Sequence, residues 1–288
     1  MSATPTLAGK TLFITGASRG IGRAIALRAA RDGANIAICA KTVEPHARLP
    51  GTIHSVAQEI AAAGGRALPI RLDVRDADNI TAAVQQCADH FGGIDICVNN
   101  ASAISLTPTL STPARKFDLI VDCNVRGTYL VSQACIPHLL ESAQKGRNPH
   151  ILNLSPPMSM DPGWFAHHLA YTISKYGMSM CTLGMAAEFR KQGVAVNSLW
   201  PRTSIATAAV EFNFPAEILK ASRTADIMSD AAHLILTAES ASTSGNFYLD
   251  ESVLRQAGIT DFERYAISPG TPLFTDLYVD TDPSGEIA

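Results

Sequence analysis

The sequence predicts a doubly wound α/β fold, in which helices cover both faces of a seven-stranded parallel sheet. Three observations support this prediction. Short apolar runs alternate along the chain with longer segments of helical periodicity. The long segments have the length of crossover helices, and right-handed crossovers between parallel strands bury both faces of a sheet. A glycine-rich turn joins the first apolar run to the first helical segment.

The first expected strand covers residues 10–16, an apolar run that ends in glycine. Residues 21–34 follow with helical spacing, because Ile21, Ile25 and Ala29 fall on one face and a glycine near the end signals the stop. The same alternation continues through a strand at 35–41, a helix at 52–65, a strand at 66–74, a helix at 76–93 and a strand at 94–101.

The second half of the chain continues the pattern. The expected elements are a long helical stretch at 113–144, a strand at 149–155, a helix at 170–193, a strand at 194–201 and a seventh strand at 245–251. Neither a linker rich in Pro, Gly or Ser nor an internal repeat interrupts them. We therefore expect one domain over residues 1–288, with a core at about 8–250 and an irregular extension at 251–288, where turn residues and acidic residues gather.

Composition excludes several classes of protein. The net charge of −3 argues against a nucleic-acid-binding surface. The chain is 47% hydrophobic, but no apolar run approaches the ~20 residues of a transmembrane helix, and the start lacks the features of a signal peptide. Six scattered cysteines without a C-x-x-C pair predict free thiols in a reducing compartment, so we expect a cytoplasmic protein. The eight histidines show no metal-binding spacing, so we expect no metal site.

The segment T-G-A-S-R-G-I-G, residues 15–22, stands directly between a strand and a helix. Gly16 allows a tight turn, and Gly20 and Gly22 allow the backbone to approach a pyrophosphate. The N-terminus of the following helix offers amide groups and a positive dipole to the phosphates. The pattern predicts a Rossmann-type dinucleotide site, to which we also assign three other residues of the turn, Ser18, Arg19 and Ile21.

The choice of cofactor depends on the end of the second strand. An NAD site places an acidic side chain about 20 residues after the glycines, to hold the ribose 2′-hydroxyl. Ala40 and Lys41 stand there instead, and Arg19 can reach the same region. Two cations without a carboxylate favour the 2′-phosphate of NADP(H), although Lys41 as a merely solvated strand end stays open as the alternative.

Two further strand ends belong to the predicted cofactor site. Asp73 and Val74 end the third strand, where Asp73 could accept a hydrogen bond from the adenine amino group. Asn100 and Ala101 end the fourth strand beside the cofactor, because carboxyl ends of parallel strands meet at one edge of the sheet.

These motifs, T-G-x-x-x-G-x-G, N-N-A and Y-x-x-x-K, make residues 8–250 resemble the short-chain dehydrogenase/reductase family. The resemblance implies that Tyr171 gives or takes the proton at the substrate oxygen. Lys175, one helical turn later, would hold the nicotinamide ribose and lower the pKa of Tyr171. Asn124 would kink a helix and hold a proton-relay water. The resemblance also places Pro201 and Thr203 against the nicotinamide or the pyrophosphate.

The helper serine departs from the family pattern. Relatives carry a serine 13 residues before the tyrosine, and that position is Met158 here. Ser155 ends the fifth strand as the serine of relatives does, so we favour it over Ser159. A third alternative is that no serine assists. Pro156 and Pro157 would stiffen the loop that follows the fifth strand.

A second departure is Arg202, which replaces a family glycine and would either meet an anionic group at the substrate mouth or be a solvated cation. The aromatic residues near the predicted site indicate either an apolar substrate pocket or local packing; they are Trp164, Phe165, Phe212 and Phe214.

We therefore expect an NADP(H)-dependent oxidoreductase that interconverts a hydroxyl and a carbonyl on an apolar, lipid- or steroid-like small molecule. A catalytically weak or inactive NADP(H)-binding sensor or scaffold is the alternative, and a dehydratase or epimerase on the same scaffold stays open. The helix with Met178, Met180 and Met185 is expected to serve the core and a subunit interface, by resemblance in a homodimer or homotetramer. The sequence also resembles members of the family that continue into a sterol-carrier domain, which we do not expect here because the sequence ends at Ala288.

Overall fold

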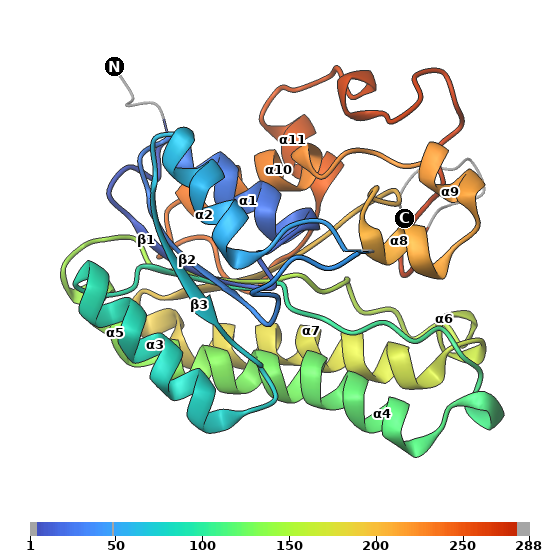
Figure 1. Cartoon of the computed structure of the whole chain (residues 1–288), viewed down its shortest axis with the longest axis horizontal. Coiled ribbons are helices and arrows are strands. Elements are labelled where there is room, and N and C mark those ends of the chain that lie inside the picture. The colour runs from blue at the N-terminus through green and yellow to red at the C-terminus, as the bar shows by residue number, and fades with distance from the viewer. Residues whose placement is uncertain (1–4, 48, 281–288) are drawn as a thin grey trace.

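A computed structural model describes residues 5–47 and 49–280. In these residues seven parallel strands form one sheet in the order β3-β2-β1-β4-β5-β6-β7 (Figure 1). The order reverses between β1 and β4, which is the topological switch point of a doubly wound sheet. The predicted fold class is confirmed.

The strands are β1 Thr11–Thr15, β2 Asn35–Ala40, β3 Arg66–Arg71, β4 Ile96–Asn99, β5 His150–Asn153, β6 Ala195–Trp200 and β7 Phe247–Leu249. The α-helices are α1 Gly20–Ala30, α2 Ile53–Ala62, α3 Ala77–Phe91, α4 Ala114–Ile120, α5 Gly127–Gln144, α6 Gly163–Ala166, α7 Leu169–Phe189, α8 Ala208–Asn213, α9 Ala216–Lys220, α10 Asp226–Thr237 and α11 Asp250–Gln256. Short 3₁₀ turns lie at Thr109–Ser111, Arg190–Gln192 and Glu263–Tyr265, and a π-helical turn covers Val121–Arg126.

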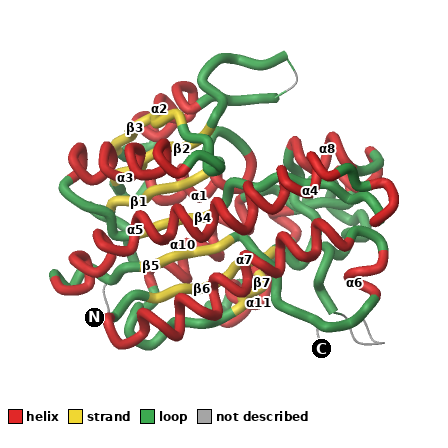
Figure 2. Tube along the Cα trace, turned by 90° about the horizontal axis from the view of Figure 1, so that it is seen from below, coloured by secondary structure: helices red, strands yellow, loops and turns green. Residues whose placement is uncertain are grey.

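Helices cover both faces of the sheet. On one face lie α3, α4, α5 and α7, and on the other lie α1, α2, α10 and α11 (Figures 1 and 2). The strands supply apolar side chains to both faces because successive residues point in opposite directions. In β1, Leu12 and Ile14 join the core under α1 and α10, whereas Phe13 joins the core under α3 and α5.

Among the differences from the predictions, three concern the longer helices and the C-terminal extension. The stretch expected as one helix at 113–144 is α4, a π-helical turn and α5, because the side chain of Asn124 bonds a neighbouring loop and widens the helix there. The sequence reasoning missed α10, which carries the crossover from β6 to β7. The predicted irregular extension begins instead with α11, since Asp250 and Glu251 start a helix directly after β7. Residues 281–288 of the predicted extension lie outside the described residues.

The carboxyl ends of the strands meet the loops that carry the predicted site residues. Helices α8 and α9 and the segment that follows α11 gather at this end of the sheet (Figure 1). The C-terminal segment runs back against the residues after β6, where Thr203 pairs with Thr275.

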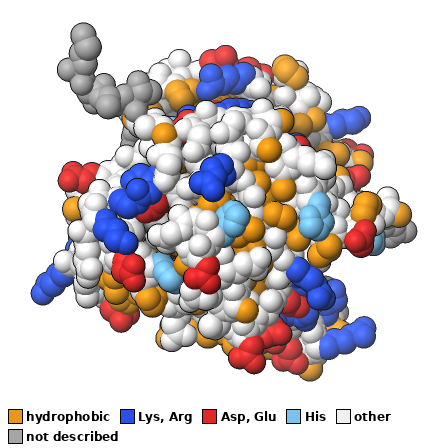
Figure 3. Space-filling view, turned by 60° about the vertical axis from the view of Figure 1, so that its left-hand side comes forward, with side chains coloured by type: hydrophobic (Ala, Val, Ile, Leu, Met, Phe, Trp, Pro, Cys, Tyr) orange, Lys and Arg blue, Asp and Glu red, His pale blue; other side chains and the backbone are white. Residues whose placement is uncertain are grey.

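The surface and the helices bear on two sequence predictions. On the face shown in Figure 3, basic and acidic side chains are interspersed with hydrophobic ones. Among the described residues, no helix combines the length and the apolar character needed to cross a bilayer. The same part of the chain contains no group of three or more potential metal-ligating side chains.

Candidate active site

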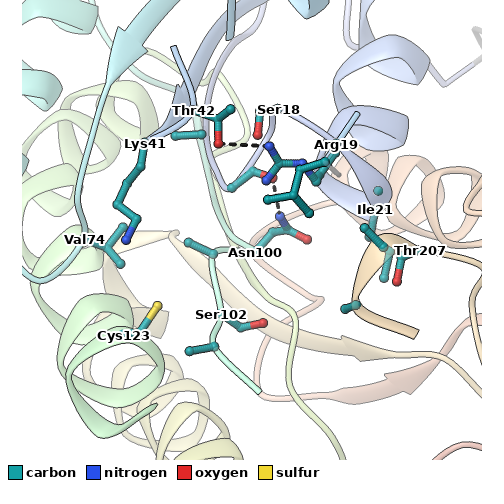
Figure 4. Close-up of a pocket in the computed structure, with 18 of the residues that line it drawn as sticks. Ser18, Arg19, Ile21, Lys41, Thr42, Val74, Asn100, Ser102, Cys123 and Thr207 are labelled. Carbon is teal, nitrogen blue, oxygen red and sulfur yellow. Dashed lines mark hydrogen bonds between the residues drawn. The ribbon is translucent and has the colours of Figure 1, made fainter. Parts of the chain in front are cut away.

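A cavity of about 500 Å³ lies at the carboxyl ends of β1, β2, β3 and β4 (Figure 4). It collects most of the residues that the sequence assigned to the cofactor: Gly16, Ser18, Arg19, Gly20, Ile21, Lys41, Asp73, Val74, Asn100 and Ala101. They come from four separate strand ends and the start of α1, as expected for a dinucleotide site in an open parallel sheet.

The glycines are required by close packing. Gly16 has φ +65°, and a Cβ added there would lie 2.8 Å from Nδ2 of Asn100. A Cβ on Gly22 would lie 2.5 Å from the same nitrogen, so Gly22 shapes the turn from behind the cavity. Asn100 Nδ2 donates hydrogen bonds to the carbonyls of Thr15 and Gly16, at 2.9 and 3.1 Å. The turn therefore leaves its backbone open toward the cavity, and a phosphate group fits at the start of α1.

Arg19 ties a neighbouring loop to this turn. Its Nη2 donates to Thr42 Oγ1 at 2.9 Å (Figure 4). Its Nε donates to the carbonyl of Pro50 at 3.0 Å, and Nη2 also donates to the carbonyl of Gly51 at 3.3 Å. All these acceptors are neutral. Burial lowers the pKa of Arg19, and no carboxylate among the described residues forms an ion pair with it. An anionic group at this end of the cavity would therefore be stabilised by a charge that the protein leaves uncompensated.

Lys41 and Asp73 line the same cavity as Arg19. The Lys41 ammonium is exposed and lies 3.9 Å from Asp73 Oδ2. Asp73 is held mainly by Arg75, whose Nη2 donates to Oδ2 at 2.6 Å, and this hydrogen bond lowers the pKa of Asp73 to about 2. The Asp73 carboxylate is thus ionised and bound by Arg75. The exposed Lys41 ammonium can also donate hydrogen bonds to a molecule in the cavity.

A second, smaller cavity of about 140 Å³ adjoins the first and contains Tyr171, Lys175 and Pro201 in its wall. Both cavities are lined by Ile21, Asn100, Ser102, Thr207 and Ala209. Most other residues around the smaller cavity are apolar, among them Leu154, Trp200, Val210, Phe214 and Leu277. A molecule extended along the first cavity therefore reaches the wall that carries the tyrosine and the lysine.

Tyr171 is 5% exposed and packs between His168 and Tyr278, with ring centroids 6.2 and 6.4 Å away. Burial raises the pKa of Tyr171 well above its ordinary value, and the neighbouring Tyr278 and Asp276 raise it further. This direction is opposite to the lowering that the sequence analysis expected from Lys175. The reason is that aromatic rings enclose the phenol and exclude water from it.

Lys175 is also buried, and its ammonium has partners of its own. Nζ donates to the carbonyl of Leu154 at 3.0 Å and lies 5.1 Å from the centre of the Trp200 ring. Burial lowers the pKa of Lys175 to about 8. The charge is therefore held at the cavity wall by a carbonyl and an aromatic face, without a carboxylate in direct contact among the described residues.

Asn124 lies in the π-helical turn behind the cavities. Its Nδ2 donates to the carbonyl of Ala103 at 3.0 Å and to Ser174 Oγ at 2.9 Å, and its Oδ1 accepts from the Ala103 amide at 2.8 Å. The side chain thus fixes the loop after β4 against α7 and lines neither cavity. Asn124 lies where the helix widens into a π-helical turn; the expected kink and a role in holding water stay predictions.

The hydroxyl of Ser155 is engaged by a residue of the next strand. Its Oγ is fully buried, lies 2.8 Å from Ser198 Oγ on β6, and that hydroxyl lies 2.7 Å from Thr182 Oγ1 on α7. Ser155 lines neither cavity, so its assignment as the helper serine stays a prediction that this geometry does not support. Ser159 lies on the loop surface and gives its amide to Tyr176 Oη at 3.2 Å.

Two residues after β6 also lie away from the cavities. Thr203 lines neither of them, and the described residues offer no hydrogen-bond partner to its buried Oγ1, so its cofactor role stays a prediction. Arg202 donates from Nη1 to Glu251 at 3.1 Å, and Glu251 also binds Arg223 and Arg255, at 2.6 and 2.5 Å. Arg202 therefore ties the loop after β6 to α11 and is neither a fully solvated cation nor a wall of the smaller cavity.

The four aromatic residues near the predicted site divide between the two interpretations, an apolar substrate pocket and local packing. Phe212 lines the larger cavity and Phe214 the smaller one. Trp164 and Phe165 pack instead into an aromatic cluster around Tyr278.

Several cavity residues escaped the sequence reasoning. Thr207 lines both cavities and caps α8, accepting a hydrogen bond from the Val210 amide; a threonine just before a helical segment was a usable signal. Asp276 lines the smaller cavity from the C-terminal segment, and no sequence pattern connects it to Tyr171. Further examples are Ser102, Cys123 and Ser204.

Residues 10–216 match the family model described as short chain dehydrogenase. The chain belongs to the short-chain dehydrogenase family. Members of this family are oxidoreductases of alcohols and carbonyl compounds, and this chain carries the family's sequence over residues 10–216. It is 58% identical over 280 residues to hydroxysteroid dehydrogenase-like protein 2 of Danio rerio, an alignment that covers 97% of this chain and 66% of that protein.

Solved short-chain dehydrogenases share the whole architecture. A structure from Xanthomonas campestris is 55% identical with a TM-score of 0.92, and the match covers 96% of this chain and 99% of that one. A more distant short-chain oxidoreductase of metagenomic origin, in complex with NADP, is 27% identical with a TM-score of 0.69, covering 84% and 97% of the two chains. A short-chain dehydrogenase from Mycobacterium paratuberculosis, 24% identical with a TM-score of 0.71 over 85% and 97%, is bound to NAD. Family members thus bind either dinucleotide.

Proposed function

We propose that this protein is an NADP(H)-dependent dehydrogenase/reductase that interconverts a hydroxyl and a carbonyl group on an apolar, lipid- or steroid-like molecule. Tyr171 serves as the proton donor or acceptor. The proposal rests on one observation above all: Tyr171 and Lys175 share the wall of an apolar cavity that adjoins the glycine-lined cavity.

The chemistry divides between the cofactor and the chain. NADPH, when bound, supplies the hydride that reduces the carbonyl carbon. Tyr171 delivers its phenolic proton to the substrate oxygen, and its high pKa in the buried site keeps that proton in place until the substrate arrives. The Lys175 ammonium stabilises the phenolate that remains, and the apolar walls hold the substrate and exclude water.

The preference for NADP(H) rests on charge. Arg19 is a partly buried cation that donates hydrogen bonds to neutral acceptors, and Lys41 offers an exposed ammonium in the same cavity. No acidic side chain ends β2, where an NAD site would have one. A 2′-phosphate would bring Arg19 the counter-charge that it lacks among the described residues, and Lys41, which pairs with Asp73 at 3.9 Å, would add a second cation.

We also propose a homodimer or homotetramer assembled through α4, α5 and α7. Large apolar side chains on these helices stay exposed in the single chain, namely Phe117, Tyr129, Ile173, Met180 and Leu183, between 39% and 61%. Met178 and Met185 of α7 are buried and belong to the core. Burying these exposed apolar side chains against a second copy would stabilise the assembly.

The remaining proposals concern domain organisation and location. We propose that residues 1–288 form one domain, because the sheet runs unbroken from β3 to β7. The six free cysteines, four of them buried, are consistent with the proposed cytoplasmic location.

A second candidate function is an NADP(H)-binding sensor without turnover. The observation that favours it is the position of Ser155, whose hydroxyl bonds Ser198 and leaves Tyr171 without the usual helper. Such a protein would bind NADPH tightly and would turn over no carbonyl compound.

Steady-state oxidation of NADPH and NADH separates the two candidates. The wild-type protein and Tyr171→Phe are compared on steroid ketones, 3-oxoacyl thioesters, fatty aldehydes and α-diketones. The proposed function predicts turnover with NADPH that falls by about 100-fold or more in the variant, with NADPH affinity unchanged. Tight NADPH binding without any turnover supports the sensor.

A further inference from the structure

The C-terminal segment contributes a carboxyl group to the smaller cavity. Residues 274–277 lie against the chain that follows β6 and are fixed by hydrogen bonds on both sides. The amide of Ser204 donates to the carbonyl of Phe274 at 2.9 Å, and the amide of Asp276 donates to the carbonyl of Arg202 at 3.0 Å. Trp200 Nε1 donates to the carbonyl of Leu277 at 2.8 Å. The backbone of Asp276 is therefore held at the cavity by bonds that do not involve its side chain.

The carboxyl group of Asp276 has a free side. Among the described residues, the one hydrogen bond to it comes from the Leu277 amide, at 2.7 Å from Oδ1. Asp276 is only partly buried and lines the same cavity as Tyr171, Lys175 and Leu154. The second oxygen, Oδ2, has no partner in this part of the chain, so it is available to a molecule in the cavity.

Charged and titratable groups surround this carboxyl group. Burial raises the pKa of Asp276 to about 7, the carboxylate of Asp250 raises it as well, and the Lys175 ammonium opposes the rise. The phenols of Tyr171 and Tyr278 also interact with it. A carboxyl group in this setting carries a proton in a large fraction of molecules at neutral pH and can then donate a hydrogen bond.

The cavity lacks the usual source of such a hydrogen bond. Ser155 bonds Ser198, Met158 occupies the position at the family spacing, and Ser159 lies on the loop surface. None of the three lines the cavity. We propose that Asp276 is a catalytic residue, whose carboxyl group hydrogen bonds the same substrate oxygen that exchanges a proton with Tyr171.

This inference rests on the proposed function. In the reductive direction the carbonyl π bond breaks, a C–H bond forms with the hydride of NADPH, and an O–H bond forms with the proton of Tyr171. The Asp276 carboxyl group keeps its own proton and stabilises the negative charge that builds on the oxygen. The tyrosine regains a proton from solvent, so the sum is carbonyl plus NADPH plus H⁺ giving alcohol plus NADP⁺.

Two substitutions test the role of the carboxyl group. Asp276→Asn keeps a donor and the shape of the side chain but cannot titrate, whereas Asp276→Leu removes every hydrogen bond to the substrate. We expect Asp276→Leu to lower kcat/KM by about 10- to 100-fold with NADPH affinity within twofold of wild type. Asp276→Asn should retain most of the activity and lose the inflection near pH 7 in the profile of kcat/KM. The control is Thr275→Val, an exposed neighbour on the same segment that lines neither cavity and should behave as wild type.

A binding measurement separates this inference from the proposed function. The chain has two tryptophans; Trp200 lines the cavity, and Trp164 packs on Tyr278 beside it, so their fluorescence reports ligand entry. Ketones of the same panel are titrated into the NADP⁺ complex, in which no turnover is needed. Weaker ketone binding in Asp276→Leu by tenfold or more supports the inference even when the wild type turns nothing over. Wild-type values of kcat/KM and of ketone affinity in Asp276→Leu overturn it, as does a panel that shows no ketone binding to the wild-type complex.

Discussion

Replacement of Lys175 by methionine should make the protein more stable and remove its activity. The pKa of this buried ammonium falls from 10.5 to about 8. Each pH unit is worth about 1.36 kcal/mol, so the charge costs the folded state about 3 kcal/mol at neutral pH. Methionine has a similar length and no charge, but it leaves the Leu154 carbonyl without its donor, which costs about 1 kcal/mol. The net expectation for Lys175→Met at pH 7 is a gain of about 2 kcal/mol, or about 4 °C in Tm.

The sign of the pH dependence makes this prediction specific. The folded pKa of Lys175 lies below its unfolded value, so the folded state binds fewer protons between pH 8 and pH 10.5. The stability of the wild-type protein should therefore gain a contribution from this group as the pH rises through that window. The advantage of Lys175→Met should shrink over the same range and be nearly gone by pH 10.

Thermal melting at pH 7 and at pH 10 measures both effects at one protein concentration without cofactor. Lys145→Met, an exposed lysine paired with Glu141 on a helix surface, serves as the control and should change Tm by less than about 1 °C at either pH. A variant Lys175→Met that melts below the wild type at pH 7, or whose advantage is the same at pH 10, would refute the reasoning from burial.

Three further outcomes follow from the geometry. Gly22→Ala should weaken NADPH binding by about tenfold or more, because the added Cβ would lie 2.5 Å from Nδ2 of Asn100. The control is Gly184→Ala, which has open space around its Cβ and should bind NADPH as the wild type does. Equal NADPH affinities of the two variants in a fluorescence titration would contradict this prediction. Arg19→Gln should raise the Kd of NADPH by about tenfold and that of NADH by less than threefold, and an equal rise for both would remove the argument for a 2′-phosphate. Tyr278→Ala should cost about 3–5 kcal/mol of stability and lower Tm by about 6–10 °C, since this buried ring packs against several aromatic side chains; an unchanged Tm would show that the cluster does not hold the C-terminal segment.

The parts of the molecule that sequence could predict are those set by local patterns. The strands and most long helices follow from apolar periodicity, and the turn at residues 15–22 follows from glycines that no larger residue could replace without a clash. The spacing of one helical turn predicts that Tyr171 and Lys175 lie on the same side of a helix, and both line the smaller cavity. The absence of an acidic residue at the end of β2 could also be predicted, because it depends only on where the strand ends in the sequence.

The parts that sequence could not predict depend on contacts between distant residues. The Ser155 hydroxyl is hydrogen bonded to Ser198, which lies 43 residues later in the chain. A backbone hydrogen bond to Arg202 holds Asp276 at the cavity, and the sequence around residue 276 contains no pattern that predicts this contact. The direction of the Tyr171 pKa was misjudged for the same reason, since the aromatic ring that encloses it, Tyr278, lies far along the chain. Helix α10 is the exception: its own periodicity was sufficient and was overlooked.

The proposed function requires that Tyr171 transfers a proton during NADPH-dependent reduction of a carbonyl group. The most direct test is NADPH oxidation by the wild-type protein and by Tyr171→Phe across the carbonyl panel, with NADPH affinity measured for both. The account predicts turnover of at least one carbonyl compound by the wild type, a loss of about 100-fold or more in the variant, and equal affinity for NADPH. Equal turnover by the two proteins, or tight NADPH binding without turnover by either, would contradict it.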